Sequence, residues 1–152
     1  MLFFGCGGQD TPADVPQSTP TLADAYIKSG DYGSAVAMFE LLLEGGAPQF
    51  NFQLGLALSL KNNGDIDRAE NVLEEMSYLF PNDYRIPMHQ AHLEMIKQSG
   101  VAIEKRDYIL SKKFYDAAVK LYSDNVTQIE SDSEMQQLSS LIEQLQYHGW
   151  ID

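Results

Sequence analysis

Apolar and small residues recur along the first half of the chain with a spacing of 34 residues. The segment Gly30-Asp31-Tyr32 recurs as Gly64-Asp65-Ile66, and the alanine that follows, Ala35, recurs as Ala69. The same spacing relates further apolar pairs on either side of this segment: Leu22 and Leu56, Ala23 and Ala57, Tyr26 and Leu60, Phe39 and Leu73, Leu42 and Met76. A fixed period of this length is typical of proteins in which helical units stack side by side.

Each unit is predicted to be two short helices joined by a tight turn. Gly30 and Gly64 can adopt the left-handed conformation that ends a helix, and Asp31 and Asp65 can cap the helix that follows. Small side chains are expected where helices approach closely, because larger ones would push the backbones apart. The alanines at these positions are Ala23, Ala35, Ala57 and Ala69. Such a unit cannot bury its apolar face alone and must pack against its neighbours.

The second half of the chain continues the pattern less regularly. From Tyr84 the register places Ala91 at the first small position, but an insertion spanning Ser99 to Arg106 delays the turn to Asp107-Tyr108. This arrangement predicts a third hairpin with longer helices or a longer turn. The alternative is two repeats followed by unrelated helices.

Residues 133–147 are predicted to form a last amphipathic helix. Its apolar residues recur at three- and four-residue spacing along one stripe. They are Met135, Leu138, Leu141, Ile142 and Leu145. A helix at this place can cap the exposed apolar face of the last repeat, and Tyr147 and Trp150 are expected to hold the chain end against the array.

The period and the Gly-Asp-Tyr turn resemble the tetratricopeptide repeat. This resemblance implies an all-α fold, a right-handed superhelix of three helical hairpins plus a C-terminal capping helix. The domain would span residues 21–152, after an apolar stub and tether at residues 1–20. The resemblance places the repeats at about residues 16–49, 50–83 and 84–123, with the capping helix at about residues 133–147.

In tetratricopeptide arrays the first helix of each hairpin lines a concave face, which here would form a groove for a partner. The residues that the resemblance places in this groove are Leu54, Leu58, Lys61, Asn62, Arg85, Met88, His92 and Met95. The strip is more apolar than a solvated surface requires, so we expect it to bind a protein or peptide segment with apolar anchors. The alternative is that the C-terminal helix or a second copy covers it. The oligomeric state stays open.

Some members of this family hold a C-terminal carboxylate with Lys and Asn side chains at fixed groove positions. The matching residues here are Pro20, Asp24, Gly55, Arg85 and His89. Only Arg85 agrees with the family's pattern, which argues against binding of a chaperone tail.

Charge and composition narrow the class of partner. The 152 residues carry a formal net charge of -12, and no basic stripe interrupts this acidity. Such a surface repels nucleic acid and anionic lipid. The acidity favours either solubility alone or a preference for basic partner segments.

No catalytic residue or cofactor site can be identified in the sequence. The three histidines, His89, His92 and His148, stand at no helical spacing that joins a nucleophile to a base, and no glycine-rich phosphate loop is present. Met88, His92 and Met95 share one predicted helical face, and their thioether and imidazole ligands suit Cu(I). Methionines at this spacing also serve as apolar packing or as an adaptable binding surface. We therefore expect a non-catalytic binding scaffold, with a Cu(I) carrier as the alternative.

The N-terminus suggests where the protein resides. Residues 2–6 are apolar and end in Gly5-Cys6, and a polar stretch rich in Pro, Gly and Thr follows up to Pro20. An apolar run ending at Gly-Cys before a polar tether resembles the end of a bacterial lipoprotein signal peptide. The resemblance implies that Cys6 is lipidated and that the domain is an extracytoplasmic, membrane-anchored lipoprotein. The alternatives are an incidental thiol and a cytoplasmic regulatory fragment of a larger protein.

Lipidation of Cys6 can be tested directly. When the gene is expressed from its native upstream start, mass spectrometry of the membrane fraction should find Cys6 as an acylated first residue. A soluble product that retains Met1 and an unmodified Cys6 would contradict the lipoprotein hypothesis.

Overall fold

The computed structural model of the chain describes residues 20–46, 49–123 and 132–152. The predicted lipidation site, Cys6, lies outside these residues. All regular structure in the described part is helical, and none of its helices combines the length and apolarity needed to cross a membrane. The elements are α1 (Pro20–Ser29), α2 (Tyr32–Glu44), α3 (Phe50–Asn62), α4 (Ile66–Leu79), α5 (Arg85–Ser99), the short 3-10 helix η1 (Ile103–Lys105), α6 (Ile109–Ser123) and α7 (Ser133–Tyr147).

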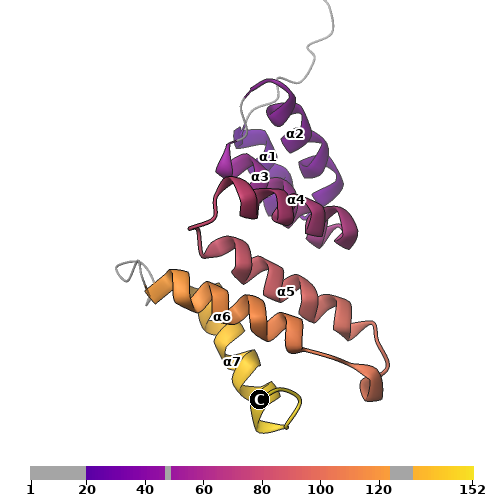
Figure 1. Cartoon of the computed structure of the whole chain (residues 1–152). Coiled ribbons are helices and arrows are strands. Elements are labelled where there is room, and N and C mark those ends of the chain that lie inside the picture. Colours follow the sequence, from indigo (N-terminus) through magenta and orange to yellow (C-terminus); the bar gives the residue numbers. More distant parts are fainter. Residues whose placement is uncertain (1–19, 47–48, 124–131) are drawn as a thin grey trace, which may run out of the picture.

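The helices pair in chain order into three stacked hairpins, α1–α2, α3–α4 and α5–α6 (Figure 1). Each helix from α1 to α5 contacts the one that follows, and α7 packs on both α5 and α6. This arrangement confirms the predicted all-α fold of three hairpins and a C-terminal helix. The insertion before α6 forms η1 and a longer turn, in agreement with a third hairpin.

Glycine makes the first two turns possible. Gly30 and Gly64 have φ angles of 77° and 84°, in the left-handed region that side chains disfavour. Asp31 caps α2 as predicted, accepting a hydrogen bond of 3.1 Å from the Ser34 amide. Asp65 was expected to cap α4 in the same way but does not, because its carboxylate accepts from the Arg68 guanidinium instead.

Two clusters of buried side chains form the core, and α5 contributes to both. The first cluster joins α1 to α5 and includes Ile86 and Leu93, while the second joins α5, α6 and α7 and includes Met88 and Ala91. The alanines predicted at close helix approaches are completely or almost completely buried: Ala23, Ala35, Ala57 and Ala69. The stack therefore continues through α5 without a break between the repeats and the C-terminal part.

The chain end is held against the second cluster, but not by both predicted aromatic residues. The Trp150 ring lies 5.5 Å from the Tyr108 ring between centroids. Tyr147 is 87% exposed, and its ring contacts only that of the adjacent His148 among the described aromatic rings. Ile151, which the sequence pattern did not single out, is buried in the cluster in its place.

A side chain from the first hairpin occupies the space beside a glycine of the second. A Cβ atom added to Gly55 on α3 would lie 2.4, 2.6 and 2.9 Å from three ring atoms of Phe39 on α2. The ring therefore sits directly on the α3 backbone, so this contact fixes how closely the first two hairpins approach.

Alanine substitutions at two helical glycines should have opposite effects. Gly55→Ala forces Phe39 to move, and overpacking of this kind costs about 1–3 kcal/mol. The free energy of unfolding should fall in spite of the better helix propensity of alanine, which contributes about 1 kcal/mol. At Gly33 on α2 the nearest atoms lie 3.8 and 3.9 Å away, so Gly33→Ala should stabilise the protein. Urea unfolding followed by circular dichroism measures both, and stabilisation by Gly55→Ala would contradict the close approach.

Candidate functional site

The apolar part of the predicted groove lies on α3. Leu54 is half-buried and packs against the first cluster. Leu58 is also half-buried, yet it belongs to neither cluster. Asn62, one turn further on, is exposed. This helix therefore presents at Leu58 a large apolar side chain that the two cores do not use.

Lys61 carries a partly buried charge next to this apolar surface. Burial lowers the pKa of its ammonium group, and the carboxylate of Glu134 on α7 offsets part of that shift. No carboxylate lies within ion-pair distance of Lys61 in the described part of the chain. A cation that is partly desolvated and not paired is available to an anionic group of a ligand.

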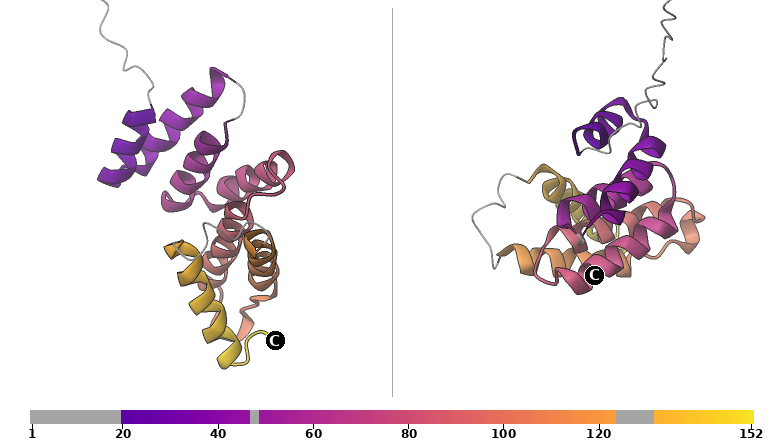
Figure 2. Two further views of the ribbon diagram at one scale, coloured as in Figure 1. Left: turned by 90° about the vertical axis from the view of Figure 1, so that its left-hand side faces the viewer. Right: turned by 90° about the horizontal axis from the view of Figure 1, so that it is seen from above.

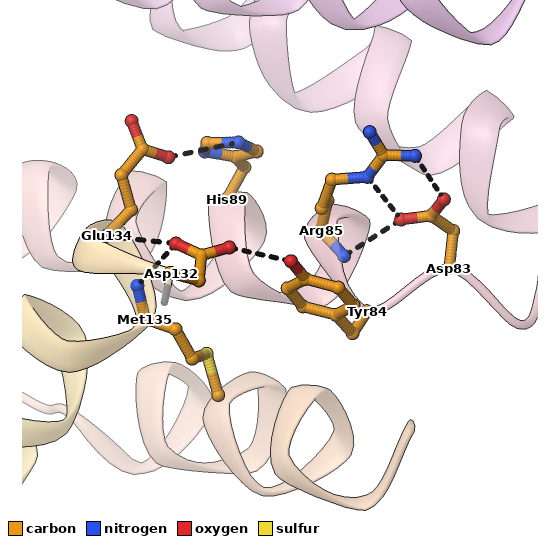
Figure 3. Close-up of polar contacts among 7 residues, drawn as sticks. All are labelled: Asp83, Tyr84, Arg85, His89, Asp132, Glu134 and Met135. Atoms are coloured by element: carbon orange, nitrogen blue, oxygen red, sulfur yellow. Dashed lines mark hydrogen bonds and ion pairs between the residues drawn. The ribbon is translucent and has the colours of Figure 1, made fainter. Parts of the chain in front are cut away.

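The second predicted groove cation, Arg85, is held by its own neighbours. Its guanidinium donates two hydrogen bonds to the Asp83 carboxylate, at 2.9 Å from Nε and 2.6 Å from Nη2 (Figure 3). The guanidinium carbon also lies 4.1 Å from the centre of the Phe50 ring. This planar, paired arrangement leaves Arg85 less able than Lys61 to engage a partner.

Met88 does not line an open groove, which differs from the sequence prediction. It is 1% exposed and belongs to the second cluster, because α7 packs alongside α5 and α6 (Figure 2). His92 and Met95 are half-buried on the same helix. The predicted Met88, His92 and Met95 set is therefore divided between the core and the surface. Among the described residues, no group of three or more His, Cys, Asp or Glu side chains could hold a metal ion.

Polar groups fix the start of α7 on α5. Asp132 accepts hydrogen bonds from the amides of Glu134 and Met135, which caps α7. The Tyr84 hydroxyl donates to the other oxygen of Asp132 at 2.7 Å (Figure 3). Burial raises the pKa of Tyr84 to about 12, assisted by Asp132. Burial opposes ionisation of Asp132, but the hydrogen bonds from Tyr84 and the two amides outweigh it and lower the pKa of Asp132.

His89 lies beneath this junction and is 2% exposed. Its Nε2 atom is 3.5 Å from a carboxylate oxygen of Glu134, and its Nδ1 atom is buried without a hydrogen-bond partner (Figure 3). Burial, and then the positive charge of Lys61, lowers the pKa of His89 to about 3. The same two causes lower the pKa of His92 to about 4. Both imidazoles are therefore neutral at pH 7.

Sequence reasoning did not find this junction as a unit. It considered His89 only as a groove position and a candidate base. His89 contacts Glu134, and Tyr84 contacts Asp132. Each pair is separated by more than forty residues in sequence, and the separation between Tyr84 and Asp132 is 48. No spacing within one helix can indicate such a contact.

The fold of this chain is similar to known tetratricopeptide proteins. Residues 21–44 match the family model of the tetratricopeptide repeat. A crystal structure of the Yersinia enterocolitica type III secretion translocator chaperone SycD matches with a TM-score of 0.71 and 21% identity, covering 86% of this chain and 91% of that chain. No curated protein sequence matches this chain.

Two structures of PcrH are also similar. PcrH from Pseudomonas aeruginosa has a TM-score of 0.67 and 17% identity, with 83% of this chain and 87% of that chain covered. PcrH in complex with the chaperone binding region of PopB has a TM-score of 0.63 and 18% identity, with 79% and 88% covered. The resemblance to the tetratricopeptide repeat is thus confirmed for residues 21–44, and the fold of most of the chain is similar to that of SycD and PcrH.

The buried histidine should make the stability depend on pH. The pKa of His89 is about 3 in the folded chain and 6.5 in the unfolded chain, so below about pH 6.5 the unfolded chain binds the proton more readily. Between pH 7 and pH 5 this linkage should lower the free energy of unfolding by about 2 kcal/mol. Urea unfolding at several pH values measures the slope.

A variant pair isolates the contribution of His89. His89→Gln removes the titrating group, so its stability should fall less between pH 7 and pH 5 than that of the parent protein. Asn51→Gln, which changes an exposed side chain that does not titrate, should keep the parent's slope. Equal slopes for the parent and His89→Gln would show that His89 does not cause the pH dependence.

Proposed function

We propose that this protein is a non-catalytic scaffold that binds an extended segment of a partner protein across the concave face of α3 and α5. The observation that carries the proposal is Leu58, a half-buried leucine that contributes to neither core cluster. Stability of the fold does not require an apolar side chain at such a position. Lys61, one turn away, forms no ion pair with a carboxylate of the described residues. Together the two side chains favour a surface that binds a ligand.

The partner segment would bind chiefly through apolar side chains. Leu54 and Leu58 on α3 are half-buried apolar residues of the predicted groove. A well-buried anchor contributes about 1–3 kcal/mol to binding. Lys61 would orient the segment by pairing with one of its carboxylates and would add little affinity at ordinary salt. PcrH, which has a similar fold, is known in complex with the chaperone binding region of PopB, and this supports the class of partner.

A selected peptide can test the concave face. Random peptides displayed on phage are selected on the full chain, and the strongest binder is then measured by isothermal titration calorimetry. Leu58→Asp should raise the Kd of this peptide about thirtyfold or more, because it places a charge where an apolar anchor is buried. Its unfolding midpoint should stay close to that of the parent, since Leu58 lies in neither core.

An exposed leucine on another helix provides the matched control. Leu41 on α2 is 50% exposed, and Leu41→Asp should leave the Kd unchanged. If Leu58→Asp binds the peptide as tightly as the parent does, the ligand lies elsewhere. If Leu58→Asp instead unfolds the protein, Leu58 is part of the core and the proposed surface does not exist.

A further inference from the structure

A cavity of about 450 Å³ lies between the C-terminal halves of α5 and α7. Most of its wall is apolar. It is formed by Met95 from α5, Leu141 and Leu145 from α7, and the rings of Tyr108 and Trp150. Its volume falls within the range of about 300–1,000 Å³ that small-molecule sites occupy in proteins.

The cavity wall is built by parts of the chain that are firmly packed. Tyr108 is buried in the second cluster and contacts the Trp150 ring. Trp150 follows a turn at Gly149, whose φ angle is 69°, and its amide donates to the Leu145 carbonyl at 2.9 Å. The next residue, Ile151, is buried in the same cluster. The cavity is therefore largely preformed, which lowers the cost of ordering it around a ligand.

One cation, Arg106, stands at this apolar cavity. Its Nε atom donates to the Val101 carbonyl at 2.9 Å and its Nη2 atom to the Ser99 carbonyl at 3.2 Å. These contacts orient the guanidinium but leave further N–H donors, since arginine has five. No carboxylate lies within ion-pair distance of Arg106 among residues 20–46, 49–123 and 132–152. The adjacent Asp107 uses its carboxylate to accept from the Ile109 amide at the start of α6.

We propose that this cavity binds a small organic carboxylate with an apolar body, of the kind represented by a medium-chain fatty acid. The apolar body packs against Met95, Leu145 and Trp150, and the carboxylate accepts hydrogen bonds from Arg106. Charge complementarity selects an anion, because neutral carbonyls orient the guanidinium and no carboxylate of the described residues pairs with it. Gln144 and His148, which also line the cavity, can donate further hydrogen bonds to the same group.

The tryptophan in the wall makes the proposal measurable. Trp150 is the only tryptophan of the chain, so its fluorescence reports on the cavity alone. Sodium decanoate, titrated into the full chain below its critical micelle concentration, should change this fluorescence saturably. Decanol, which has the same chain and no charge, should bind more weakly. Arg106→Gln should raise the Kd for decanoate about tenfold or more and leave that for decanol unchanged.

Two further variants keep the test specific. Arg68→Gln removes an exposed arginine of α4 that lies outside the cavity wall, and it should bind decanoate like the parent. Leu141→Glu adds a carboxylate to the wall at a half-exposed position of α7 and should weaken decanoate binding without touching the Arg106 contacts. The proposal is overturned if decanoate gives no saturable change, or if decanol binds as well as decanoate. It is also overturned if both Arg106→Gln and Leu141→Glu retain the parent's Kd.

Peptide binding at the concave face and decanoate binding in the cavity can be tested independently of each other. Leu58 does not line the cavity, so Leu58→Asp should leave decanoate binding intact. Loss of peptide binding in Leu58→Asp with unchanged decanoate binding would support both sites as independent.

Discussion

Helix α5 is buried on two sides because it contributes side chains to both core clusters. Each of the other α-helices packs into one of these two clusters. Ile86 and Leu93 belong to the cluster shared with α1 to α4, whereas Met88 and Ala91 belong to the cluster shared with α6 and α7. A helix whose side chains are buried on two faces lies inside a fold and not at its edge. Because α5 contributes side chains to both cores, its position affects which side chains of the inner face stay accessible.

The proposed sites follow from how α7 packs on α5. Near the start of α7, Asp132 holds it close to Tyr84, and this close packing covers Met88 and buries His89. Towards the other ends of the two helices the space between them widens into the cavity beside Trp150. Among the described residues, Leu58 on the neighbouring α3 is half-buried and belongs to neither core. One helix thus accounts for a buried polar junction, a preformed cavity and an uncovered apolar surface.

The parts of the fold that depend on local backbone chemistry could be predicted from the sequence. The 34-residue period predicts the left-handed glycines Gly30 and Gly64 and buried alanines such as Ala57. Equivalent positions in successive repeats have the same backbone conformation and the same close helix contacts. The helix at residues 133–147 follows from its apolar stripe. These features require no knowledge of which distant segments meet.

The contacts that shape the site could not be predicted in this way. The period assigns Met88 and Leu58 to equivalent faces of their helices, and only the docking of α7 distinguishes them. Arg85 was expected to face a ligand, but Asp83 is close enough in sequence to hold it. The cavity around Arg106 is formed partly by the insertion before α6, which no repeat pattern describes.

Amide hydrogen exchange followed by NMR can locate the partner segment on the concave face. Exchange is compared in the full chain with and without a saturating amount of a peptide selected on it. We expect added protection in α3 around Leu58 and in α5 around His92, with little change in α2 and α4. Protection confined to α2 and α4, with α3 unchanged, would place the ligand on the outer face and contradict this expectation.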